Sequence, residues 1–117
     1  TKGAHVVTGV ASANEWSDDQ VVAIGGAVEG DSEHPLARAI VTAARTRGDV
    51  PRATDFRSIT GRGVEADVDG QRFALGGPAL LRQRTLTVPP ELLTAVSGWE
   101  QRGAAVLYLR NRRPRAV

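Results

Sequence analysis

A carboxylate and a histidine stand five residues apart, just ahead of a proline, in the segment Glu29-Gly-Asp-Ser-Glu-His-Pro. Asp31 and Ser32 are good helix caps, and proline is favoured in the first turn of a helix. His34 is therefore expected at the mouth of a helix that begins at Pro35, where backbone N–H groups face outward. A hydrogen-bond acceptor and an aromatic ring beside one helix terminus would suit an adenine ring. The same residues also fit an ordinary helix start with a surface histidine, because short motifs are common by chance.

The elements around this segment are predicted to be helical. Ser17 and Gln20 form a capping box, and apolar residues recur after it at helical spacing, so a helix is expected to end in the glycine-rich stretch 25–30. A second helix is expected from Pro35 to Gly48. Residues 29–34 are then the bend of a helical hairpin.

The middle of the chain has the alternating pattern of β-strands. Asp69-Gly70 separates two alternating runs, 64–68 and 71–75, which predicts a two-residue hairpin turn. Further strands are expected at 5–10, 56–60 and 105–109, with a short helix after Pro78 and a longer one from Pro89 to Gly103. The expected fold class is α+β, a mainly antiparallel sheet flanked by helical hairpins.

Composition restricts the function. The 117 residues suffice for one domain, and the absence of cysteine excludes disulfides and thiolate chemistry. The sequence has no phosphate-binding loop of the Gly-x4-Gly-Lys type, no nucleophile elbow and no metal-ligand spacing. No catalytic residue and no metal ligand are therefore predicted, and a binding module is favoured over a complete enzyme.

Glycines at two places allow close approach of a ligand to the backbone. Gly61 and Gly63 stand at the entry to a predicted strand, and Gly76-Gly77 follows another. Taken alone, the first pair is better explained by a bend or bulge in the sheet, and a plain strand-to-helix turn also explains the second.

The order of these motifs resembles one family. Glu-x4-His-Pro, a helix, Gly-x-Gly-Val, a hairpin and Leu-Gly-Gly-Pro are similar to the nucleotide-binding (N) domain of heavy-metal-transporting P-type ATPases, over nearly the whole chain. The resemblance implies that Glu29 accepts a hydrogen bond from the adenine amine and that His34 contacts the base. It implies that Gly61 and Gly63 admit ribose and phosphates, that Val64 packs near the base and that Gly76 completes the pocket wall. Many copper pumps of the family have Gly-Asn where this chain has Gly76-Gly77, so one polar contact is missing here.

The same resemblance implies the wider setting. ATP would be bound, as its magnesium complex in the intact pump, and its phosphate would pass to an aspartate on a neighbouring phosphorylation domain that is absent from these residues. Residues 1–117 would be one cytoplasmic domain of an integral membrane protein, with 1–4 and 111–117 as remnants of linkers. Its partners would be the phosphorylation and actuator domains of the same polypeptide, with no nucleic acid and no membrane contact of its own.

Two alternatives remain open from the residues alone. Four arginines lie within 110–117, and without them 11 basic residues face 13 acidic ones, so the basic character belongs to the C-terminal end. A non-enzymatic module could bind nucleic acid through this cluster, with steep salt dependence and no preference for adenine. A structural interaction domain would bind no nucleotide.

Overall fold

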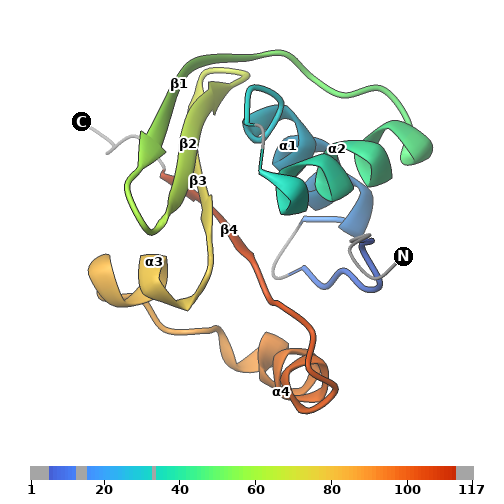
Figure 1. The fold of residues 1–117 in the computed structure, drawn as a ribbon, viewed down its shortest axis with the longest axis vertical. Helices are drawn as coiled ribbons and strands as arrows, with labels where there is room; N and C mark the ends of the chain where they lie inside the picture. Colours follow the sequence, from blue (N-terminus) through green and yellow to red (C-terminus); the bar gives the residue numbers. More distant parts are fainter. Residues whose placement is uncertain (1–5, 13–15, 33, 113–117) are drawn as a thin grey trace.

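A helical hairpin packs against one side of a four-stranded antiparallel sheet in the computed structural model, which describes residues 6–12, 16–32 and 34–112 (Figure 1). The strands are neighbours in chain order, β1-β2-β3-β4. This confirms the predicted α+β class. The elements are α1 (Asp18–Val28), α2 (Pro35–Arg47), β1 (Ala53–Ile59), β2 (Gly63–Val68), β3 (Gln71–Gly76), α3 (Pro78–Gln83), the 3-10 turn η1 (Pro90–Leu92), α4 (Leu93–Gln101) and β4 (Tyr108–Arg112).

α1 begins at the predicted capping box and ends at Val28, within the predicted stretch 25–30, so both ends confirm the sequence prediction. The Gln20 backbone N–H donates to Ser17 Oγ at 3.1 Å, and the Ser17 N–H donates to Gln20 Oε1 at 2.8 Å, which completes the capping box. Gly26 does not end the helix but lies buried inside it. A Cβ at Gly26 would meet the Cβ of Ala44 in α2, so this glycine lets the two helices approach closely.

The core forms where α1 meets the inner face of the sheet. It consists of buried side chains from α1, β2 and β3, and the ring of Trp16 packs edge-on against Phe73 with centroids 5.9 Å apart. The β2–β3 turn has the positive φ angles of a type I′ turn, 52° at Asp69 and 79° at Gly70, as predicted. The buried cluster comprises Ala27, Val28, Ala66, Val68, Phe73 and Leu75.

The opposite side of β2 and β3 carries an ion-pair network centred on Arg72. Its guanidinium lies 3.1 Å from Asp67 Oδ1, 3.3 Å from Asp55 Oδ2 and 3.6 Å from Glu65 Oε1. Arg84, at the end of α3, reaches the same Glu65 oxygen at 3.6 Å. These carboxylates therefore form ion pairs on the polar side of the sheet. Within the described residues, no group of three or more acidic, histidine or cysteine side chains could hold a metal ion.

The strands at the two ends of the chain differ from the prediction. Val6–Val10 forms no strand, and His5 lies outside the described residues. β4 begins at Tyr108 instead of Ala105, because Tyr108 pairs with Gly76, where β3 ends. It then continues through residues 111–112, which the sequence had assigned to a linker.

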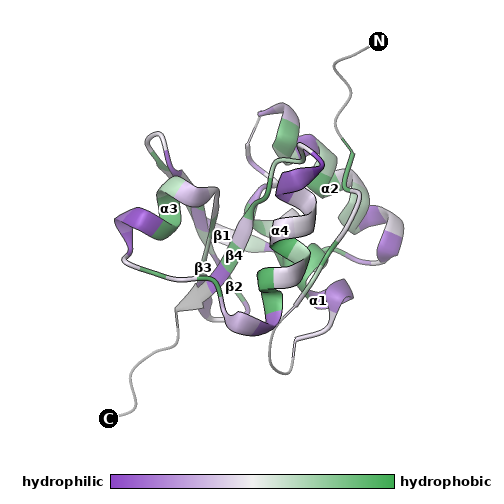
Figure 2. Cartoon of the chain, turned by 90° about the horizontal axis from the view of Figure 1, so that it is seen from below, coloured by the Kyte–Doolittle hydropathy of each residue, from purple (hydrophilic) through white to green (hydrophobic). Residues whose placement is uncertain are grey.

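The two helices that follow the sheet hairpin, α3 and α4, do not pack together as a helical hairpin in the way that α1 and α2 do. α4 lies at the far end of the molecule from the β2–β3 turn (Figure 1). Within it, Leu93 is 49% exposed, whereas Val96 is buried. Coloured by hydropathy, the end of α3 is strongly hydrophilic, while α4 carries apolar stretches (Figure 2). Among the described residues, no helix is long and apolar enough to cross a membrane.

Candidate functional site

Glu29 is a buried carboxyl group that forms no ion pair with any residue in the described part of the chain. It caps the C-terminus of α1, where its backbone N–H donates to the carbonyl of Gly25 at 3.0 Å, and its own carbonyl accepts from the N–H of Ser32 at 2.9 Å. Only 8% of the residue is exposed, and burial raises the pKa of the side chain to about 6. Buried acidic residues are rare unless they are paired. A carboxyl group in this situation is a candidate for a binding role.

His34 lies at the mouth of α2, as predicted, but it caps the helix itself. Its Nδ1 accepts a hydrogen bond from the backbone N–H of Leu36 at 3.1 Å, and its own N–H donates to Ser32 Oγ at 3.3 Å. Asp31 and Ser32 were expected in the capping role, so that expectation is wrong. Because Nδ1 is an acceptor here, the neutral ring carries its proton on Nε2. The exposed ring can therefore donate from Nε2, or stack, without leaving the cap.

The candidate glycines divide into two kinds. Gly63 and Gly76 are directly paired across β2 and β3, and a Cβ on Gly63 would collide with the Leu75 carbonyl oxygen. A Cβ on Gly76 would collide with the carbonyl oxygen of Arg62, so the protein's own backbone explains both glycines. Gly61, in the β1–β2 turn, has φ 71° and open space where its Cβ would be. Of Gly61, Gly63 and Gly76, only Gly61 leaves room for a ligand to approach at the position of the missing side chain.

Val64 connects the glycine turn to the helical hairpin. It follows Gly63 in β2, pairs with Leu75 and packs against the buried cluster that contains Val28. Val28 directly precedes Glu29, so Glu29 in the α1–α2 bend and Val64 in β2 both adjoin this one cluster. Register brings Gly63, Val64 and Gly76 together, while the α1–α2 bend brings Glu29 and His34 together.

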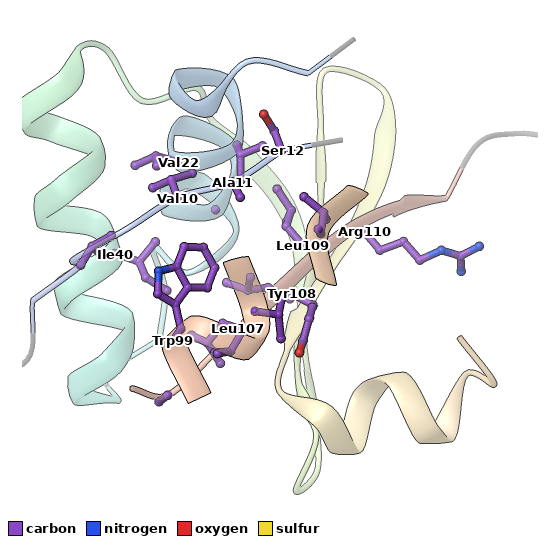
Figure 3. Close-up of a pocket in the computed structure, with 18 of the residues that line it drawn as sticks. Val10, Ala11, Ser12, Val22, Ile40, Trp99, Leu107, Tyr108, Leu109 and Arg110 are labelled. Carbon is purple, nitrogen blue, oxygen red and sulfur yellow. The ribbon is translucent and has the colours of Figure 1, made fainter. Parts of the chain in front are cut away.

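A large apolar cavity lies elsewhere in the molecule. Its volume is about 1800 Å³, and it is bounded by α1, α2, α4, β4 and the segment from Val6 to Ser12. Trp99 projects from α4 toward the first two helices, while the side chain of Arg110 points away from the cavity (Figure 3). None of the candidate residues lines it. The candidate residues of the α1–α2 bend and of the β1–β2 turn therefore lie apart from this cavity.

The chain has relatives among the metal pumps, although no family model matches it. A probable copper-exporting P-type ATPase V of Mycobacterium tuberculosis is 36% identical over 110 residues, which cover 93% of this chain and 14% of that protein. A silver-exporting P-type ATPase of Salmonella typhimurium is 31% identical over 110 residues, 93% of this chain and 13% of that protein. The chain thus spans about a seventh of the length of these relatives.

Solved structures agree with the sequence relatives. The N-domain of a copper-transporting P-type ATPase matches with a TM-score of 0.74 and 26% identity, over 92% of this chain and 90% of that one. A zinc-transporting PIB-type ATPase matches with a TM-score of 0.79 and 26% identity, over 92% of this chain and 17% of that one. By sequence and by fold, the chain belongs with the N-domains of heavy-metal-transporting P-type ATPases, which confirms the predicted resemblance.

Proposed function

We propose that residues 1–117 form a single nucleotide-binding domain that holds ATP. The observation that carries the proposal is the buried carboxyl group of Glu29, which has no ion-pair partner among the described residues. It shares one bend with the exposed ring of His34, in a chain of N-domain fold. A carboxyl group accepts from the exocyclic amine of adenine, and an imidazole ring can stack on the base or donate to it.

The β1–β2 turn would receive the rest of the nucleotide. Gly61, with open space at its Cβ position, lets ribose and phosphate approach the backbone. Gly63 and Gly76 keep β2 and β3 close together beneath this turn. Val64, on the inner side of β2, supplies apolar contact near the base.

The intact protein would be a metal-translocating P-type ATPase that couples ATP hydrolysis to cation transport. This domain would present the γ-phosphate of magnesium-bound ATP to an aspartate on the phosphorylation domain of the same polypeptide, so its contribution is positioning. It would lie on the cytoplasmic side and meet the membrane only through other parts of the pump. Relatives are named for different metals, copper and silver, so the proposal extends to a heavy-metal cation and no further.

ATP binding by the 117-residue chain tests the proposal. Few anchors and an open site predict a dissociation constant on the order of 0.1–1 mM. Titration with ATP should shift the amide NMR signals of the α1–α2 bend and of the β1–β2 turn. Glu29→Ala should abolish these shifts, while the matched substitution of an exposed glutamate, Glu91→Ala, should leave them unchanged.

The same titration distinguishes an ATP-binding domain from the alternative, a basic module that binds nucleic acid through its C-terminal arginines. Removal of residues 113–117 spares β4 and should leave ATP binding intact. Loss of binding on this deletion, equal shifts with GTP and disappearance of the shifts in salt would instead support a basic module.

Two substitutions at His34 separate its cap from its contact with the base. His34→Ala removes the acceptor for the Leu36 N–H and should lower the free energy of unfolding by about 1 kcal/mol. His34→Asn keeps a good cap and should unfold close to the original protein in urea. Both should weaken ATP binding to a similar extent, because both lack the ring. Full ATP affinity in His34→Asn would show that the histidine serves the helix alone.

A further inference from the structure

The surroundings of Glu29 favour an uncharged side chain. The residue ends α1, where the helix dipole is negative and disfavours a carboxylate, and the last turn of α1 contains no basic residue. No described residue forms an ion pair with Glu29, and burial raises the pKa of its side chain. Desolvation and the helix dipole thus both disfavour the carboxylate, and no cation of the described residues compensates for them.

The charged groups on neighbouring elements are engaged elsewhere or exposed. Arg47 of α2 pairs with Asp19 at 2.9 Å, and Arg72 of β3 pairs with carboxylates on the opposite side of the sheet. Arg62 in the β1–β2 turn donates to the carbonyl of Thr60 at 3.3 Å. Asp55 of β1 pairs with Arg72 at 3.3 Å. The other charged or titratable groups that the structure describes in α2, β1 and the bend are exposed: Arg38, Arg45, Arg57, Asp31 and His34.

We propose that Glu29 pairs with adenine as the neutral carboxylic acid and takes up one proton from solution when ATP binds. This rests on the proposed function. Adenine presents a donor, N6–H, beside an acceptor, N1, on its pairing edge. The neutral acid offers the complementary carbonyl acceptor and O–H donor, so two hydrogen bonds form. The carboxylate can accept from N6–H only and turns its second oxygen toward the lone pair of N1.

The same chemistry makes the choice of base depend on pH. Guanine presents two adjacent donors, N1–H and N2–H, which suit the carboxylate, whereas the neutral acid can pair with either base. Burial already raises the pKa of Glu29 to about 6 in the free protein, so protonation near neutral pH demands little. Preference for ATP over GTP should therefore fall as the pH rises.

Calorimetric titration of the 117-residue chain with ATP and GTP between pH 5.5 and 8.5, in pairs of buffers with different ionisation enthalpies, tests the proposal. ATP affinity should fall by up to about tenfold per pH unit above pH 6, with close to one proton taken up per ATP at the high end. The ATP-to-GTP affinity ratio should fall in parallel. Titration of the triphosphate cancels in this ratio, because both nucleotides carry the same phosphates.

Glu29→Gln is the decisive variant. Its amide presents an acceptor and a donor at every pH, so ATP should bind without proton uptake at this site and with a constant ATP-to-GTP ratio. Glu91→Gln, at an exposed position, should behave like the original protein. If the original chain binds ATP but its ATP-to-GTP affinity ratio does not change with pH, this proposal is overturned while the proposed function stays in place. No binding of ATP at any pH, by the original chain or by Glu29→Gln, would remove both.

Discussion

Gly63→Ala should lower the free energy of unfolding by about 3 kcal/mol, far more than the same change two residues earlier. A Cβ at Gly63 meets the Leu75 carbonyl oxygen and the Gly76 Cα, two backbone atoms that cannot move without separating β2 from β3. Overpacking of this kind costs about 1–3 kcal/mol. The φ of 152° adds a further unfavourable contribution for any residue with a side chain.

Gly61→Ala is the matched control. Its φ of 71° is unfavourable for alanine, but its Cβ would enter open space, so a loss of about 1 kcal/mol is expected. Urea unfolding followed by tryptophan fluorescence compares the two variants. Equal losses would mean that β2 and β3 separate easily at Gly63, and that close packing does not explain the glycine there. Because Gly61→Ala should remain folded, it is also the variant in which weaker ATP binding reports on ligand contact.

Local signals in the sequence predicted the parts of the fold that depend on a few adjacent residues. The capping box at Ser17, the proline at the start of α2 and the Asp69-Gly70 turn each have a short-range physical cause, and each lies where it was expected. The helix mouth at His34 was predicted for the same reason.

Features that depend on distant partners were not predictable in this way. Gly26 lies inside α1, and its close packing against Ala44 of α2 depends on a partner 18 residues away in the sequence. The start of β4 at Tyr108 depends on where β3 ends. Likewise, the Gly-x-Gly motif at 61–63 does not reveal that Gly63 pairs with Gly76 on the next strand. The apolar pattern from Val6 to Val10 predicts a strand, but a strand also needs a neighbour with which to pair, and this segment has none in the described structure.

The sequence predicted which residues form the candidate site, but it did not predict the burial of Glu29 or the raised pKa of its side chain. Glu29 was predicted at the bend as a hydrogen-bond acceptor. Its burial arises only when the end of α1 packs over β2 and β3. The raised pKa that follows from this burial has a measurable effect on folding.

Glu29→Gln should stabilise the fold at high pH. The pKa of Glu29 rises from 4.5 to about 6 on folding. A group with a raised pKa in the folded state contributes its stability below pH 4.5 and loses it as the pH rises through 6. Ionisation of Glu29 should therefore cost the original protein roughly 2 kcal/mol at pH 8, and the glutamine variant escapes this cost.

Urea unfolding at pH 4, 5, 6 and 8 gives the difference between the two proteins. It should be near zero at pH 4, grow between pH 4.5 and 6, and level off above pH 7, while Glu91→Gln should show no such step. A difference that does not change with pH would mean that Glu29 ionises as readily in the folded chain as in the unfolded one. A carboxyl group that lowers stability at neutral pH has no structural reason to lie at this position. Stabilisation by Glu29→Gln, together with loss of ATP binding in Glu29→Ala, would show that the position serves the ligand and not the fold.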